Sequence, residues 1–285
     1  ISGTWSGDWG PTAAHRNPVT VDLKWDGKAL TGVVNPGPRA IQLQKTTFDA
    51  KTGYAFYADP FFVVDNGAVL VEALNRKTGL GEIIRIEGAI HEPVLKNHGH
   101  ASYPATARIG GHEIDVPEIA RWSPPLAFQA GDTQLKELGK LRIEGNPRLL
   151  DPTLIERNGT VYLFGNVREV GSNALYLWHA PSIDALFVAH PANPIRISPL
   201  GSRMGGALVE EDGRLFRLGQ DFSGAYGDGL LSFEIEELSP ERYRERLLGS
   251  IAFPDRKGPH TLNFRDGQAV FDWYVDRLAP LAGVR

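Results

Sequence analysis

A turn glycine with proline or a similar residue seven positions before it recurs five times in this sequence and constrains the fold more than any other feature. The pairs are Pro60 with Gly67, Pro104 with Gly111, Pro152 with Gly159, Gly206 with Gly213, and His260 with Gly267. Successive turn glycines lie 44, 48, 54 and 54 residues apart. Each copy is therefore expected to be one supersecondary unit that carries several strands.

Each copy has the pattern of a strand, a tight turn and a second strand. In the third copy the apolar run 153–155 leads to Asn158-Gly159, and the apolar run 161–164 follows. Asn-Gly, Asp-Gly and Gly-Gly supply the positive φ angles that tight hairpins require. Repeats of about 40–55 residues with several strands are typical of propeller blades, so we predict an all-β, five-bladed β-propeller. The alternative is a β-sandwich, whose turns recur about every 8–12 residues without a longer period.

Composition excludes several classes of partner and site. The chain has 285 residues and a net charge of −4 with no long basic run, which argues against a nucleic-acid partner. It has no cysteine, so disulfides, thiolate metal sites and cysteine nucleophiles are excluded. Apolar runs stay well short of the 18 or so residues of a transmembrane helix, so no such segment is expected.

Two stretches differ from the repeat. Residues 1–53 are predicted to form a short antiparallel β segment with strands at 3–7, 19–25 and 29–34, which leaves 54–285 for the propeller. The stretch 239–246 is predicted to be a short surface helix, because Ser239 is a suitable cap and Pro240 a suitable first helical residue.

Equivalent positions of the repeat place polar residues around the expected central channel. The residues just before the proline position are Asp59, Tyr103, Asp151, Gly205 and Pro259. Because proline follows Asp59 and Asp151, we expect both to be extended. The second strands carry polar residues five or seven positions after the turn glycine, namely Glu72, Glu118, Asn166, Gln220 and Asp272. Offsets of equal parity point to one side of a strand, which predicts a polar ring; the alternative is that each residue caps its own strand end.

Carboxylates that converge on one pocket are what glycoside hydrolysis requires. One carboxyl must donate a proton to the leaving oxygen, and a second must activate water or attack the sugar. Asp59, Glu118 and Asp151 come from three successive copies of the repeat, so they are predicted to surround one sugar ring.

Six motifs in order carry a resemblance to a known family. They are Ala58-Asp59-Pro60-Phe61, Ser102-Tyr103-Pro104, Val116-Pro117-Glu118, Asp151-Pro152-Thr153-Leu154, the run 213–220 and the run 258–263. Together they resemble the propeller domain on the N-terminal side of glucosamine inositolphosphorylceramide transferases, over about residues 54–285. That domain is similar in turn to five-bladed glycoside hydrolases of the arabinanase and β-xylosidase type.

The resemblance implies roles for individual residues. Asp59 would be the general base, Glu118 the general acid, and Asp151 the residue that adjusts pKa and orientation. The expected substrate-binding residues are Glu72, His100, Tyr103, Trp122, Asn166, Arg203, Gln220, Tyr226, His260 and Asp272. No cofactor is expected, although His260 is a candidate to help hold a metal ion near the channel axis, as in some arabinanases.

The predicted function is therefore a glycoside hydrolase that acts on an oligosaccharide or glycoside at the central pocket. The first alternative is a non-catalytic carbohydrate-binding or glycosyltransferase-accessory domain that uses the same pocket. The second alternative is a lyase, an isomerase or another enzyme that uses the channel.

Overall fold

The computed structural model describes residues 3–9, 17–25, 30–38, 40–42, 53–63, 67–88, 90–95, 99–119, 124–129, 134–224, 226–253 and 257–273. Every regular element within these ranges is a β-strand, which confirms the all-β prediction. None of the described residues forms a helix that is long and apolar enough to cross a membrane. The chain divides into two compact units, one of residues 1–53 with 275–285 and one of residues 54–274.

The first unit contains one antiparallel sheet with the strand order β1-β2-β3-β4. Its strands are β1 (Gly3–Trp9), β2 (Asn17–Trp25), β3 (Leu30–Val34) and β4 (Ile41–Gln42). The first three coincide closely with the strands expected from the sequence, which alternate apolar and polar residues.

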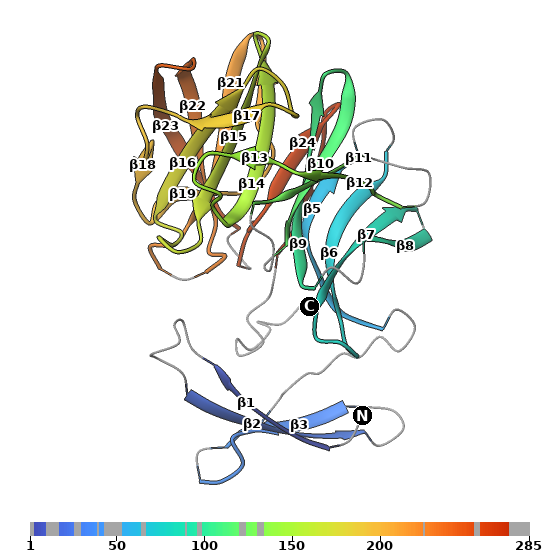
Figure 1. Cartoon of the computed structure of the whole chain (residues 1–285). Helices are drawn as coiled ribbons and strands as arrows, with labels where there is room; N and C mark the ends of the chain where they lie inside the picture. Colours follow the sequence, from blue (N-terminus) through green and yellow to red (C-terminus); the bar gives the residue numbers. More distant parts are fainter. Residues whose placement is uncertain are drawn as a thin grey trace. The chain divides into compact units, whose positions relative to one another are not determined.

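The second unit has a propeller-like arrangement with four blades, whose strands pair mostly antiparallel (Figure 1). Blade 1 consists of β5 (Tyr54–Phe62), β6 (Val69–Asn75), β7 (Gly81–Glu87) and β8 (Ile90–Leu95). Blade 2 consists of β9 (Ala101–Ile109), β10 (His112–Ile119), β11 (Leu126–Gln129) and β12 (Lys136–Lys140). In both blades the chain passes from each strand to its neighbour, as tight hairpins dictate.

Blades 3 and 4 follow the same plan with small additions. Blade 3 consists of β14 (Leu149–Arg157), β15 (Thr160–Val167), β16 (Ala174–Ala180) and β17 (Leu186–Ala189), with β13 (Arg142–Ile143) and β18 (Arg196–Ile197) at its edges. Blade 4 consists of β19 (Leu200–Met204), β20 (Val209–Glu211), β21 (Arg214–Asp221), β22 (Leu230–Leu238) and β23 (Tyr243–Ile251).

The fifth copy of the repeat forms a two-stranded sheet of β24 (Leu262–Arg265) and β25 (Gln268–Phe271). Its inner strand bonds to blades on both sides. The Leu262 N–H donates to the Gly205 carbonyl of blade 4 at 2.9 Å, and the Asn263 side chain donates to the Pro60 carbonyl of blade 1 at 2.7 Å. In Figure 1, β24 accordingly lies beside β5. The hairpin therefore joins the last complete blade to the first.

Apolar side chains fill the space between successive blades. One cluster joins blades 2 and 3 through residues such as Val116 and Phe187, and another joins blades 1 and 2 through residues such as Leu70 and Phe128. A third, with Phe61, Tyr103 and other residues, draws on all four blades. Since each sheet is apolar on both faces, the blades stabilise one another and hold the inner strands in place.

The helix expected at 239–246 is wrong. Ser239 lies in the turn between β22 and β23, where its hydroxyl accepts the N–H groups of Glu241 and Arg242 at 3.3 and 3.0 Å. The same capping chemistry therefore closes a hairpin rather than starting a helix. Alternating arginines on β23 then pair with glutamates on β22, for example Arg246 with Glu236 at 3.1 Å.

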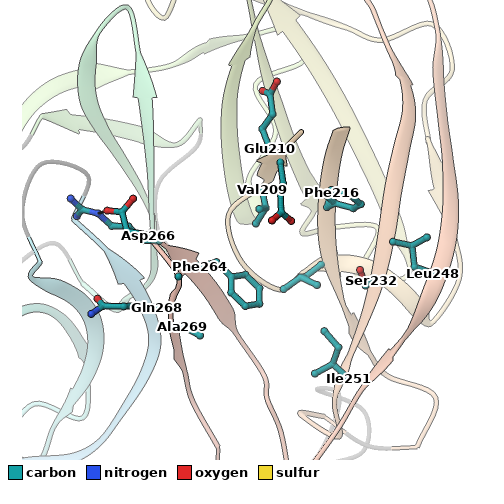
Figure 2. A pocket seen from close by; sticks show the side chains of 14 residues that line it. Val209, Glu210, Phe216, Ser232, Leu248, Ile251, Phe264, Asp266, Gln268 and Ala269 are labelled. Atoms are coloured by element: carbon teal, nitrogen blue, oxygen red, sulfur yellow. Dashed lines mark hydrogen bonds and ion pairs between the residues drawn. The ribbon is translucent and has the colours of Figure 1, made fainter. Parts of the chain in front are cut away.

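The small size of the β24–β25 hairpin leaves one face of blade 4 partly uncovered. The resulting cavity, about 620 Å³, is called the outer groove here. Figure 2 shows its walls, with Phe216 and Leu248 from blade 4 and Phe264 and Gln268 from the hairpin. The predicted site residues do not line it, so the outer groove is a consequence of the architecture and not the candidate functional site.

Candidate functional site

Three inner-strand residues at equivalent positions adopt an unusual backbone conformation. Asp59 on β5, Tyr103 on β9 and Asp151 on β14 have φ angles of 50°, 44° and 47°. The expectation that Asp59 and Asp151 are extended is therefore wrong. The strand register shifts at both aspartates, so the chain bulges and turns their N–H groups out of the ladder. Non-glycine residues with positive φ persist where their surroundings compensate the strain.

Carboxylates supply this compensation. The Asp59 N–H donates to Asp272 Oδ2 at 3.0 Å, the Tyr103 N–H to Asp59 Oδ2 at 3.2 Å, and the Asp151 N–H to Glu118 Oε2 at 3.2 Å. The carboxylates that bind Tyr103 and Asp151 come from the preceding blade in the chain, and the one that binds Asp59 comes from Asp272, directly after β25. Two of these carboxylates, Glu118 and Asp272, belong to the set predicted to form a polar ring, and both bind the backbone of a neighbouring element.

Asp59 lies at the centre of a dense hydrogen-bond network. Its Oδ1 accepts from the Thr261 hydroxyl at 2.7 Å and lies 3.1 Å from His260 Nδ1. Asp272 Oδ2 lies 3.2 Å from the same nitrogen. Burial opposes ionisation of Asp59, but the charge and hydrogen bond of His260 and the Thr261 hydroxyl hold its pKa below the usual value. Burial also disfavours the His260 cation, yet Asp59 and Asp272 raise its pKa to about 10.

A second network surrounds Asp151. Arg203 forms a two-pronged ion pair with it, with Nε 2.6 Å from Oδ2 and Nη2 3.2 Å from Oδ1. The Gln220 amide donates to Asp151 Oδ2 at 2.9 Å. Glu118 lies beside this pair, 3.8 Å from Arg203 and 3.4 Å from Arg168. Burial first, and then the charge of Asp151, raise the pKa of Glu118 to about 7, against the opposing charge of Arg203.

A cavity of about 330 Å³, called the central cavity here, opens on the first network. Its lining residues are Phe56, Tyr57, Ala58, Asp59, Glu72, Tyr226, His260, Asp272 and Trp273. Five predicted site residues therefore meet there. Glu118 and Asp151, two of the three predicted catalytic carboxylates, are not among the lining residues. Trp122 lies outside the described residues.

Glu72 is the lining carboxyl with the weakest local compensation. Its Oε1 lies 3.6 Å from His100 Nε2, whose other ring nitrogen accepts the Gly81 N–H at 2.9 Å. Burial, together with the negative charges of Asp59, Glu118 and Asp151, raises the pKa of Glu72 to about 8, although His260 opposes the shift. At neutral pH Glu72 is thus mainly a neutral acid, while Asp59 in the same cavity is ionised.

Other predicted site residues form hydrogen bonds to backbone groups within the protein. Asn166 is fully buried, and its amide donates to the carbonyls of Ser172, Ala174 and Ser202. The Tyr103 hydroxyl accepts the Gly206 N–H at 3.1 Å. These residues connect blades and do not line the central cavity.

Among the aromatic residues that line the central cavity, Tyr226 was predicted from the sequence, whereas Phe56, Tyr57 and Trp273 were not. Phe56 and Trp273 are about half exposed, at 45% and 46%. Tyr226 packs on the His260 ring with 4.7 Å between ring centroids. A sequence signal was present, because Phe56 and Tyr57 lie three and two residues before Asp59 and Trp273 directly follows Asp272.

Asp59, His260 and Asp272 also have the residue types of a metal site, with ligand atoms within 4.8 Å of one another. The His260 ring nitrogen that faces both carboxylates is already bonded to them and is held in its protonated form. A metal ligand must be neutral imidazole, and Ca²⁺ prefers about 6–8 oxygens. The three residues therefore fit an internal ion pair better than a metal site, and no metal enters the function proposed below.

These pKa shifts predict that the protein loses stability as pH rises. Glu72 binds its proton more tightly in the folded state, with a pKa of about 8 against 4.5, so its contribution declines across that interval. The contribution of His260 to stability is complete below pH 6.5 and is lost as pH rises through about 10.

Glu72→Gln is expected to be more stable than the parent by about 1–3 kcal/mol near pH 8.5 and equal to it near pH 5, as measured by urea unfolding. Exposed Glu241→Gln is the control and is expected to leave the pH profile unchanged.

Two plant proteins are similar to this chain over most of its length. Glucosamine inositolphosphorylceramide transferase 1 of Arabidopsis thaliana is 28% identical over 224 residues, which is 73% of this chain and 29% of that protein. The protein of the same name from Oryza sativa subsp. japonica is 31% identical over 206 residues, which is 67% of this chain and 27% of that protein. The chain thus spans less than a third of the length of these relatives.

Solved structures of glycoside hydrolases have a similar fold. A β-xylosidase/α-arabinofuranosidase from a compost microbial metagenome aligns with a TM-score of 0.52 at 12% identity, over 85% of this chain and 93% of that one. An enzyme from Xanthomonas citri, in complex with xylose, aligns with a TM-score of 0.51 at 11% identity, over 80% of this chain and 86% of that one. At such low identity these matches establish the fold alone.

The family model described as the N-terminal part of glucosamine inositolphosphorylceramide transferase 1 matches residues 18–268. This range includes all four blades, the β24–β25 strands up to Gln268, and every described residue of the central cavity except Asp272 and Trp273. The chain therefore belongs to the glucosamine inositolphosphorylceramide transferase 1 N-terminal family.

Proposed function

We propose that this chain is a carbohydrate-binding propeller domain whose central cavity holds a sugar. The supporting observation is that half-exposed aromatic rings and buried polar groups meet in this one cavity. Phe56 and Trp273 offer faces on which a sugar ring can stack, and Glu72 and His260 offer hydrogen bonds. His260 Nε2 in particular is buried without a hydrogen-bond partner among the described residues. Cavities with apolar walls and a few convergent polar groups are typical of small-ligand sites.

Binding is favoured over hydrolysis by Asp59, Glu118 and Asp151 because all three carboxylates are engaged within the protein. Asp151 is neutralised by Arg203, and Glu118 holds the Asp151 N–H. A general acid and a nucleophile or base must face the same glycosidic bond. Of the three, Asp59 is the one among the residues that line the central cavity, which supports binding over hydrolysis by this set.

A glycosidase that uses a different pair of carboxyls is the second candidate. Asp59 and Glu72 both line the central cavity, and their environments shift their pKa values in opposite directions. An ionised base and a protonated acid in one cavity are what hydrolysis requires. This pairing replaces Glu118 with Glu72 as the proposed proton donor.

The plant relatives suggest the setting in which a sugar site would act. Their names describe transfer of glucosamine to inositolphosphorylceramide. We propose that the propeller unit positions a glycan or glycolipid head group in a protein of this kind. Residues 54–274 are proposed to carry this role as one unit, with residues 1–53 as a separate segment.

We also propose that β24 and β25 are the inner half of a fifth blade. The position of this hairpin in the repeat supports the assignment, because Gly267 follows the fourth turn glycine by the same 54 residues that separate the third and fourth. Its hydrogen bonds to Gly205 of blade 4 and Pro60 of blade 1 support a closed ring.

The proposal predicts that Trp273→Ala weakens sugar binding without unfolding the protein. Loss of one stacking face is expected to reduce affinity about tenfold, since aromatic contacts contribute on the order of 1 kcal/mol beyond burial. Binding of xylose, arabinose, glucose and glucosamine would be measured by saturation-transfer NMR and calorimetry. Phe264→Ala is the matched control, because Phe264 is 51% exposed on the same unit and lies outside the central cavity.

Activity measurements on the same proteins distinguish the carbohydrate-binding domain from the glycosidase. Turnover of aryl-glycosides that disappears in Asp59→Asn would support the glycosidase. Binding without turnover would support the binding domain. If none of the sugars binds and none of the glycosides is cleaved, the proposed function is wrong.

A further inference from the structure

The second strand of the fifth repeat is more exposed than its counterparts in blades 1 to 3. Three of the four residues of β25 are exposed. The equivalent strands β6, β10 and β15 are buried along most of their length, and each lies between two strands of its own blade. Within the described residues β25 pairs with β24 alone. Its outer edge therefore carries backbone N–H and C=O groups that are available to a further strand.

Blade 4 is also less covered than blade 3. The Leu175 and Leu177 side chains of blade 3 are fully buried in the cluster that blade 3 shares with blade 4. On the side of blade 4 that faces the outer groove, Leu248 is 43% exposed and Phe216 is half-buried. Figure 2 shows these two side chains on one wall and Phe264, itself 51% exposed, on the other. The outer groove therefore has apolar walls and a volume of about 620 Å³ between them.

Carboxylates gather at the rim of the outer groove. Glu210 and Glu211 lie on β20, next to the β20–β21 turn, and Asp266 lies in the equivalent turn between β24 and β25. The basic side chain among the lining residues is Arg265, which pairs with Asp266 at 3.4 Å and donates to the Val63 carbonyl. The rim is thus acidic, and charge complementarity favours an occupant with a basic group there.

From this arrangement we propose that the outer groove binds an extended segment of another polypeptide, which pairs with the outer edge of β25 as the third strand of the fifth blade. Its alternate side chains are apolar, because one face of an added strand lies against Phe216, Leu248 and Phe264. A lysine or arginine at its end lies near Glu210 and Glu211. Strand addition of this kind obtains affinity from main-chain hydrogen bonds and specificity from alternate side chains.

The acidic rim disfavours an anionic membrane surface as the occupant, because like charges repel. The inference goes beyond the proposed sugar binding, which uses a different cavity. It rests on the proposal that β24 and β25 are the inner half of a fifth blade, since only then is a third strand missing at this edge.

The test uses synthetic strand peptides with the 285-residue chain. The first peptide alternates valine and threonine and has a lysine at each end, and the second has glutamates in place of the lysines. Fluorescence anisotropy of the labelled peptides measures both affinities at low salt. The lysine peptide is expected to bind at least about tenfold more tightly, because the rim carries the opposite charge. High salt is expected to reduce this difference, since Glu210 and Glu211 are exposed.

Methylation of peptide nitrogens tests the pairing with β25. Successive residues of a strand direct their N–H groups to opposite edges, so methyl groups on alternate nitrogens block one edge and leave the other free. Two versions of the lysine peptide are compared, one methylated at the valine nitrogens and one at the threonine nitrogens. One version is expected to bind at least about tenfold more weakly and the other to retain its affinity. Equal affinity of both versions would contradict edge pairing.

Variants of the groove locate the binding site. Leu248→Ser is expected to weaken binding of the lysine peptide about tenfold, because it removes apolar surface from one wall. Leu186→Ser on β17 is the matched control, since Leu186 is 45% exposed and lies outside the outer groove, and it is expected to leave binding unchanged. The double variant Glu210→Gln, Glu211→Gln is expected to remove the preference for lysine ends. Urea unfolding verifies that each variant is folded.

Sedimentation of the chain alone tests the other possible occupant, a second copy of the chain. A monomer is expected, and a dimer that Leu248→Ser dissociates would assign the groove to self-association and overturn this inference. Absence of binding for every peptide, or undiminished binding to Leu248→Ser, would overturn it as well. None of these outcomes bears on the sugar-binding function, which is measured separately at the central cavity with Trp273→Ala. Equally, failure of every sugar to bind leaves the strand site standing.

Discussion

Arg203→Met is expected to lower the free energy of unfolding by about 3–5 kcal/mol, one of the largest losses that a single substitution causes in this protein. The guanidinium is the cation that compensates Asp151, which is 2% exposed, and it also lies 3.8 Å from Glu118. Without it, two buried carboxylates face each other with little compensation, and burial of an unpaired charge is costly. The melting temperature is expected to fall by roughly 6–20 °C for a unit of this size. Urea unfolding and calorimetry measure both quantities.

Two further variants separate this mechanism from general damage to packing. Adding Asp151→Asn to Arg203→Met is expected to recover most of the loss, since the second change removes the charge that the first leaves unpaired. Arg148→Met is the control, because its ion pair with Glu169 has side chains 45% and 51% exposed and is expected to contribute less than about 1 kcal/mol. A loss below about 1 kcal/mol in Arg203→Met would show that solvent screens the Asp151 network.

Gly206→Ala is expected to destabilise the protein by about 2–4 kcal/mol, because it separates blade 4 from the β24–β25 hairpin. A Cβ atom at this position would lie 2.2 Å from the Leu262 carbonyl oxygen, and the glycine has a φ angle of +148°. The Leu262 backbone is itself bonded to Gly205, so the carbonyl cannot move away without opening the junction. Chemical unfolding of the variant measures the loss.

Gly213→Ala is the matched control for the backbone effect. Gly213 has a φ angle of +72°, but a Cβ atom there would have no neighbour within 4 Å. Its substitution is expected to cost about 1 kcal/mol from the positive φ alone. The difference between the two variants therefore reports the close approach of blade 4 to β24. Equal losses would mean that this junction is loose, and the proposal of a closed five-bladed ring would lose its main support.

The sequence by itself determined the strands and the turns that connect them. Gly111, Gly159, Gly213 and Gly267 all have the positive φ angles that their turn dipeptides predict, between 72° and 79°. The strands flank these turns because apolar residues alternate or run together on either side. Such information is local, so one chain without relatives is enough to place the repeat and to predict a propeller-like, all-β fold.

Where the local sequence is compatible with two backbone conformations, the tertiary structure decided which one forms. Ser239 followed by Pro240 is compatible with a helix start, but pairing of β23 with the edge of β22 makes a hairpin turn of it. Proline after Asp59 favours an extended backbone locally, yet the Asp272 carboxylate accepts the Asp59 N–H and helps to hold Asp59 at a φ angle of 50°. In both cases contacts between distant segments outweigh a local preference of about 1 kcal/mol.

Only the tertiary structure decided which carboxyls share a cavity. The sequence identifies Asp59, Glu72, Glu118 and Asp151 as equivalent polar positions, but equivalence in a repeat does not determine which of them a ligand can reach. Arg203 neutralises Asp151 by pairing with it, and Trp273 adds an aromatic wall beside Asp272. Ion pairs and cavity walls form between blades, from residues far apart in the chain, so their arrangement is set by blade packing and not by local sequence.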